Sequence, residues 1–245
     1  MQAFEDFNIT VSEIVRADYR TADVLKKNGI NYCCGGKIPL TQACAAQNID
    51  YKKLLQELRS ATKTVSLPNI LQYDQWRIDF LVDYIINVHH EYVKQTIPAV
   101  EVNLLSFVNS HKKQYPVLID TQATFLRLAE LVNLHTRHEE EIIFPYIKQI
   151  ANAYNRKESY GSLFVRTLRK PLSNLETEHS KIMNLLSQLR SLTNNYTFPN
   201  NACTNHRVVF QKLHEFDNDL VQHKHLENNI LFPRSIELEQ ALLQV

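Results

Sequence analysis

Two stretches of this sequence repeat one pattern. Residues 135–145 read HTRHEEEIIFP, and residues 223–233 read HKHLENNILFP, 88 positions later. Each copy has a histidine, a glutamate four residues on, and a Phe-Pro pair that begins five residues after the glutamate. The polar positions match as well as the apolar ones, which a repeated hydrophobic patch would not require. Because residues i and i+4 share one face of an α-helix, each copy can direct an imidazole and a carboxylate at one spot.

The composition predicts an all-α protein that buries a full core. The chain has 245 residues, 44% of them hydrophobic, and only four glycines, too few for many tight hairpin turns. Its 27 basic and 26 acidic residues leave a net charge of +1, so nucleic acid is not an expected partner. No uninterrupted apolar run reaches the roughly 18 residues of a membrane span, and the N-terminus lacks a secretory signal. With four cysteines and no disulfide framework, we expect a cytoplasmic protein with no membrane partner.

The chain is expected to divide into two parts. Residues 1–60 read as a small helical domain in which Thr21 and Asp50 can cap helices, with the turn NYCCGGKIP between them. Residues 61–71 lose the helical period and contain a proline, so we interpret them as a linker. Residues 72–245 then form the larger domain.

Four long amphipathic stretches make up that larger domain, at residues 72–110, 117–152, 163–194 and 203–242. Four helices with short connections fit an up-down bundle. A histidine pair separated by 45 residues, His90 and His135, is matched by a pair separated by 44, His179 and His223. The second helical hairpin therefore copies the first, which indicates an approximate internal two-fold symmetry.

These spacings predict a metal centre inside the bundle. The expected ligands are His90, His135, Glu139, His179, His223 and Glu227. Imidazole and carboxylate without thiolate suit iron or manganese better than a structural zinc, and carboxylates on facing helices are typical of di-iron sites. If both glutamates bridge two ions, each ion has four protein donors and an open position for oxygen, water or substrate.

The other residues near the pattern are expected to be structural. The Phe-Pro pairs should pack the core with their phenylalanines, Phe144 and Phe232, and bend the helices with their prolines. Three histidines neighbour a ligand and should lie on other helix faces, at the surface or around the ligands: His89, His138 and His225. Three more have no partner at ligand spacing: His111, His206 and His214.

Five ordered motifs give the sequence a family resemblance. They are DYRTADVLKKNGINYCCGGKIPL at 18–40, VHHEYVKQTIP at 88–98, HTRHEEEIIFP at 135–145, LETEHS at 175–180 and HLENNILFPR at 225–234. Over essentially the whole chain, the sequence resembles the repair-of-iron-centres (RIC) di-iron proteins, a haemerythrin-like group with an N-terminal Cys-Cys-Gly-Gly domain. The resemblance implies a haemerythrin-like four-helix bundle and the same six ligands. It selects His90 over His89, because the family's ligand lies eight residues before the proline found here as Pro98.

The resemblance also implies a function. These proteins repair iron-sulfur clusters damaged by oxidative or nitrosative stress, by donating iron, by handling nitric oxide, or both, at two iron ions joined by an oxo or hydroxo bridge. Cys33 and Cys34 would then handle iron or nitrosyl groups, since adjacent cysteines do not readily close a relaxed disulfide. The alternative is a small buried turn in which Gly35 and Gly36 permit positive φ. Cys44 and Cys203 are interpreted as ordinary small apolar residues.

Several functions remain open at this stage. Expected partners are damaged or apo iron-sulfur proteins, with nitric oxide or oxygen as small ligands; a homodimer is left open. The same centre could serve an oxygen or nitric oxide sensor, an iron store or a nitric oxide reductase. The sequence does not separate iron from manganese, or iron donation from nitric oxide removal, and it does not identify an electron donor.

Overall fold

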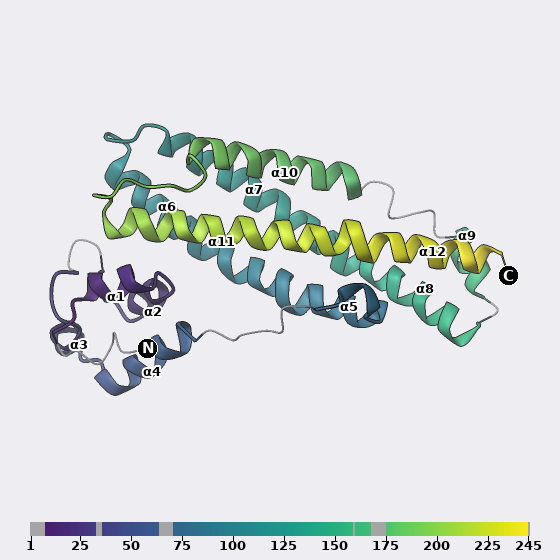
Figure 1. Cartoon of the computed structure of the whole chain (residues 1–245), viewed down its shortest axis with the longest axis horizontal. Helices are drawn as coiled ribbons and strands as arrows, with labels where there is room; N and C mark the ends of the chain where they lie inside the picture. The colour runs from purple at the N-terminus through teal and green to yellow at the C-terminus, as the bar shows by residue number, and fades with distance from the viewer. Residues whose placement is uncertain (1–7, 33–35, 64–70, 159, 168–174, 245) are drawn as a thin grey trace.

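The computed structural model describes residues 8–32, 36–63, 71–158, 160–167 and 175–244. Within these ranges the regular structure is helical, and the β-type pairing is one isolated bridge between Thr10 and Pro39. Long helical rods lie side by side, with a group of short N-terminal helices against one end of them (Figure 1). The expected all-α bundle with a small helical N-terminal domain is confirmed.

The described residues of the N-terminal part form short helices: α1 (Val11–Ala17), α2 (Thr21–Lys27), α3 (Leu40–Gln47) and α4 (Tyr51–Ala61). Asp50 caps α4 as expected, because its carboxylate accepts from the N–H groups of Lys52 and Lys53. The expected cap at Thr21 is wrong. Thr21 is already helical, and its hydroxyl donates to the carbonyl oxygen of Asp18 at 2.6 Å, so Arg20 occupies the cap position.

The first two bundle rods come from the stretches expected at 72–110 and 117–152. The elements are η1 (Tyr73–Gln75), α5 (Ile78–Tyr84), η2 (Ile85–His90) and α6 (Glu91–His111), then α7 (Leu118–His138), η3 (Glu139–Ile143) and α8 (Phe144–Arg156). The fourth rod contains α11 (Thr204–Leu226), η5 (Glu227–Leu231) and α12 (Phe232–Leu243). Helix α6 packs against α7 and α11, and α7 also packs against α10 (Leu175–Leu192).

The third stretch, expected as one helix over 163–194, is two helices instead. The short α9 (Gly161–Thr167) packs against α8 and α12, whereas α10 begins at Leu175 and packs against α7. Figure 1 shows the two at different places along the bundle.

Each Phe-Pro pair follows a π-helical turn that the sequence analysis did not anticipate. The N–H of Phe144 donates to the carbonyl of Glu139, five residues earlier, and Phe232 donates in the same way to Glu227. Helices α8 and α12 then begin with the proline in their first turn, where a missing N–H is tolerated. Phe144 is 1% exposed and Phe232 8%, so both pack in the core as expected. The carboxylates of both repeated motifs therefore lie at the start of widened turns.

The N-terminal helices pack on α11. Val208 of α11 is fully buried within the apolar cluster of the N-terminal helices. Tyr19 donates its hydroxyl to Glu215 at 2.7 Å, and Lys212 forms an ion pair with Asp23. The boundary expected at residues 61–71 stays a prediction, because residues 64–70 lie outside the described ranges. Among the described helices, none combines the length and apolar character that a transmembrane helix needs.

Candidate metal centre

The six expected ligands meet in the interior of the bundle. Each long rod contributes: His90 ends η2, His135 lies in α7, His179 in α10 and His223 in α11. The carboxylates of Glu139 and Glu227 come from the first residues of η3 and η5. All six side chains are buried, with exposed fractions of at most 4%. The structure thus brings together every residue that the sequence analysis proposed as a ligand.

The imidazoles form two pairs that cross between the repeats. The Nε2 atoms of His90 and His223 lie 3.1 Å apart, and those of His135 and His179 lie 2.8 Å apart. Adjacent ligands on one octahedral ion, with metal–nitrogen bonds of about 2.1 Å, would be about 3 Å apart. Each pair therefore has the spacing of two neighbouring ligands on one ion.

The two carboxylates lie between these pairs. Glu139 places one oxygen 3.4 Å from Nε2 of His90 and the other 3.3 Å from Nε2 of His135. Glu227 does the same, with oxygens 2.8 Å from Nε2 of His223 and 3.4 Å from Nε2 of His179. Two groups of potential ligands result, and both contain both glutamates. This is the arrangement that carboxylates bridging two ions require.

Glu139 supplies the test of whether a cation fits. Its side chain is fully buried, yet within the described part of the chain neither carboxylate oxygen has a hydrogen-bond partner. A buried carboxylate without partners is strongly unfavourable unless a positive charge compensates it. The surrounding donors are imidazole nitrogens and carboxylate oxygens, which suit iron or manganese. The residues present therefore fit a metal centre.

The electrostatics of the group keep the Glu139 carboxylate ionised. Burial raises the pKa of Glu139, but the positive charge of His135 outweighs it and holds that pKa well below its usual range. Burial lowers the pKa of His135, while the negative charge of Glu139 raises it to about 9. Burial lowers the pKa of the neighbouring His179. The two imidazoles, whose Nε2 atoms lie 2.8 Å apart, thus have pKa values shifted in opposite directions beside an anionic carboxylate.

Three residues that the sequence analysis missed orient the histidines. The Nδ1 atom of His90 contacts Glu140 at 2.8 Å, that of His135 contacts Glu178 at 2.9 Å, and that of His179 contacts Asn228 at 2.7 Å. These acceptors fix the proton on Nδ1 and leave the Nε2 lone pair facing the centre, as the outer partners of metal-bound histidines do. Each of these residues is adjacent in sequence to a proposed ligand. This adjacency is the feature of the sequence from which they could have been predicted.

The approximate two-fold symmetry places His89 at the position equivalent to Glu178, although among the described residues it makes a ring contact and no hydrogen bond with His223. Glu178 precedes His179 and supports His135; by symmetry, His89 precedes His90 and should support His223. The His89 ring is stacked on that of His223, with centroids 5.5 Å apart and planes 8° apart. His89 is 2% exposed and its Nδ1 contacts Asp219 at 2.8 Å. Of the two positions expected for it, at the surface or around the ligands, His89 occupies the second.

The remaining histidines and cysteines lie outside this group. His138 and His225 are partly or well exposed, and His214 is exposed near Asn218. His206 is buried among aromatic rings, and burial lowers its pKa to about 4. Cys44 is a buried core residue, as expected. Cys203 was expected to be an ordinary apolar residue, but it also has a polar role. Its Sγ caps α11, accepting from the N–H of His206, and lies 3.4 Å from Nε2 of His111. Cys33 and Cys34 lie outside the described residues.

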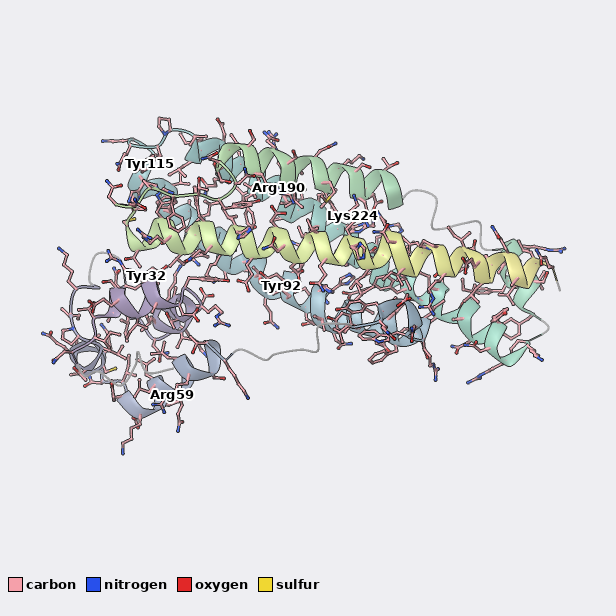
Figure 2. The ribbon with its side chains drawn as sticks, in the orientation of Figure 1. Tyr32, Arg59, Tyr92, Tyr115, Arg190 and Lys224 are labelled. Atoms are coloured by element: carbon pink, nitrogen blue, oxygen red, sulfur yellow. The ribbon has the colours of Figure 1, made fainter. Side chains whose placement is uncertain are left out.

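A small cavity reaches the centre from one side. Its volume is about 20 Å³, and it is lined by ligand candidates together with Val132, Ile182, Leu220 and Lys224. A volume of this size holds about one water molecule. Lys224 is labelled on the α11 rod in Figure 2. Only water or a diatomic molecule would reach the centre by this route without movement of side chains.

Comparison with known proteins identifies the class to which this fold and site belong. Residues 81–235 match the hemerythrin HHE cation binding domain, and the chain belongs to that family. Residues 7–62 match the ScdA_N domain of unknown function (DUF542).

The chain is also similar to individual proteins over most of its length. It is 29% identical over 228 residues to the iron-sulfur cluster repair protein YtfE of Escherichia coli O17:K52:H18 and of Shigella boydii serotype 4, covering 92% of this chain and 96% of each relative. The resemblance to the RIC family drawn from the five motifs is confirmed.

Proposed function

We propose that this chain binds two iron ions in the bundle and repairs damaged iron-sulfur clusters in the cytoplasm. The ligands would be His90 and His223 for one ion and His135 and His179 for the other, with Glu139 and Glu227 bridging. The observation that carries the proposal is the pair of shared carboxylates, since each one presents an oxygen to both imidazole pairs. The naming of similar proteins as cluster repair proteins supports the same function.

The residues of the chain would prepare the site in three ways. The outer acceptors Glu140, Glu178 and Asn228 hold three imidazoles with Nε2 facing inward. The Glu139 carboxylate is held anionic, and together with Glu227 it would balance much of the positive charge of the bound ions. The narrow cavity admits small molecules and excludes larger ones. When bound, iron would supply redox chemistry and affinity for oxygen or nitric oxide.

Iron can also be the cargo of the reaction. A bridging carboxylate that shifts from two ions to one would weaken the hold on an ion, so that iron could pass to an apo cluster. The Cys33-Cys34 pair is proposed to receive iron or a nitrosyl group on its way to the client protein. Replacement of both cysteines by alanine should then slow repair while two irons per chain remain bound. Unchanged repair in that double variant would exclude this role of the cysteines.

The proposed function is tested in two stages. Metal analysis of protein expressed with ample iron should give about two irons per chain, and the aerobic spectrum should show the near-ultraviolet bands of an oxo-bridged pair. The loaded protein should then restore activity to an iron-sulfur dehydratase inactivated by nitric oxide. Bound zinc, or no metal at all, would contradict the metal assignment. Full loading without any restored activity would contradict the repair function.

The same protein preparation separates the competing functions. Catalytic consumption of nitric oxide with a supplied reductant, yielding nitrous oxide, would indicate a reductase. Stoichiometric binding without turnover or transfer of iron would indicate a sensor or a store. Isotope-labelled iron in the protein distinguishes iron donation from nitric oxide removal, because only donation places the label in the repaired cluster.

A further inference from the structure

A line of aromatic rings connects the outside of the bundle with one of the proposed metal ligands. The ring of Trp76 packs edge-on against that of Tyr84, with centroids 5.2 Å apart, and Tyr84 lies 5.7 Å from the ring of His89. The His89 ring is stacked on that of His223 at 5.5 Å. These separations are those of aromatic rings in direct contact. Each ring is therefore a neighbour of the next, from Trp76 to the proposed ligand.

The two ends of this line differ in exposure and in chemistry. His89 is 2% exposed, whereas Tyr84 and Trp76 are half-buried, and Phe80 beside the Trp76 ring is 54% exposed. Trp76 is the only tryptophan of the chain. Among aromatic side chains, indole and phenol rings give up an electron most readily. The line thus joins the buried centre to oxidisable rings that solvent molecules can reach.

His89 differs from the outer partners of the other ligands. The other three ligand histidines each present Nδ1 to a carboxylate or amide oxygen. His89 instead lies face to face with His223, and its own Nδ1 contacts Asp219 at 2.8 Å. A carboxylate in its place could orient His223 by a hydrogen bond, as Glu178 orients His135. The stacked ring supplies an overlap of π electrons that a carboxylate does not.

The rings that stack on other ligands do not lead to the surface. Phe144 is stacked on His90 at 5.4 Å, and Phe232 is stacked on His179 at 6.0 Å. Both phenylalanines are buried, and a benzene ring is much harder to oxidise than a phenol or an indole. Among the ring contacts of the described residues, the line through His89 is the one that links a ligand to tyrosine and tryptophan.

The chemistry of a partly loaded centre creates a need for such a line. Reduction of hydrogen peroxide to two water molecules takes up two electrons and two protons. Two ferrous ions supply both electrons and become ferric, but a centre that has given one ion to a client supplies only one. The second electron must come from the protein or from a reductant. The cavity of about 20 Å³ is too small for an organic reductant, so this electron must pass through side chains.

We propose that Trp76, Tyr84 and His89 form a path along which the centre draws this electron from the surface. The inference rests on the proposed function, because it requires iron in the bundle. The indole of Trp76 loses one electron, and its N–H proton passes to solvent. Tyr84 and His89 end as they began, and a soluble reductant such as ascorbate returns an electron and a proton to the indole. Oxidation is thereby directed away from the ligands.

The test uses full-length protein carrying about one ferrous ion per chain, as measured by metal analysis. It is mixed without oxygen with one equivalent of hydrogen peroxide and frozen for electron paramagnetic resonance. The spectrum should show an isolated ferric ion together with an indole radical, which belongs to Trp76 because the chain has no other tryptophan. Mass spectrometry of peptides from unfrozen samples should find oxidised Trp76. The zinc-loaded protein should give neither signal, which excludes direct attack on the indole.

Variants then test the path itself. Tyr84→Phe keeps a ring of the same shape but raises the barrier for electron transfer, so the rate of Trp76 oxidation should fall at least about tenfold. Tyr154→Phe is the matched control, because Tyr154 is 47% exposed and lies in α8, outside the line. Trp76→Phe should replace the indole radical by a tyrosyl radical. Unchanged melting temperatures would show that these three variants are folded.

Three results would overturn the proposal. A ferric ion without an indole radical or oxidised Trp76 would mean that the electron comes from elsewhere. Equal oxidation of Trp76 in the zinc-loaded protein would mean that peroxide reaches the indole directly. An unchanged rate in Tyr84→Phe would remove Tyr84 from the path. A chain that binds no iron at all would instead contradict the proposed function, so the two failures are distinguishable.

Discussion

The outer acceptor of His135 offers the sharpest test of the metal centre. Glu178 accepts from Nδ1 of His135 at 2.9 Å, and its side chain is 29% exposed. Loss of an outer partner of a metal ligand typically weakens metal binding 10- to 100-fold. Because solvent partly screens this carboxylate, the lower end applies, so Glu178→Ala should weaken binding of the more weakly held iron about tenfold, or about 1.4 kcal/mol.

The assay is anaerobic competition for ferrous iron against a chelator of known affinity, with iron per chain counted at each step. Glu178→Gln keeps an acceptor oxygen and loses only the charge, so its loss should be about threefold. Glu141→Ala is the matched control, because Glu141 is exposed and lies two residues from the proposed ligand Glu139. Unchanged iron affinity in a folded Glu178→Ala variant, or the same loss in Glu141→Ala, would refute the reasoning.

Three further predictions follow from other parts of the structure. Asn228→Asp should tighten iron binding about fivefold in the same assay, because a charged acceptor would replace a neutral one on its histidine; weaker binding would contradict this. Cys203 caps α11 and should react with iodoacetamide at pH 7 much faster than Cys44, because burial raises the pKa of the Cys44 thiol. Mass spectrometry of the labelled peptides measures both rates, and equal rates would contradict an effect of the cap. Tyr196→Phe removes a buried bond to a carboxylate and should lower the Tm by about 3–12 °C, while Tyr154→Phe at an exposed position should not; equal Tm values would count against the bond.

The sequence was most informative where periodicity and chemistry coincide. The repeated motifs fixed the positions of Glu139 and Glu227, because residues four apart on a helix share a face whatever the rest of the chain does. The helical periodicity of the apolar residues also predicted the long helices of the bundle. It failed over 163–194, where the structure has two separate helices, α9 and α10, that the periodicity read as one.

The outer shell of the centre was harder to predict for a physical reason. Glu178 supports a histidine on a different helix, so its role depends on how α7 and α10 pack, which periodicity does not specify. His89 was hard to predict for the same reason. Its position next to His90 predicted that it lies on a different face of the helix, but not that this face packs against His223. The π turns were not predicted either, because the widened turn after each glutamate keeps the apolar spacing of an ordinary helix over the neighbouring residues.

The distribution of the six proposed ligands bears on the synthesis of the protein. His223 and Glu227 belong to the fourth rod. One ion position would use both residues and the other would use Glu227, so each position needs a side chain from this rod. A growing chain that still lacks this rod has no complete set of donors for either ion. Iron loading must therefore wait until the fourth rod has left the ribosome and docked, so that a product truncated before this rod would hold no competent centre.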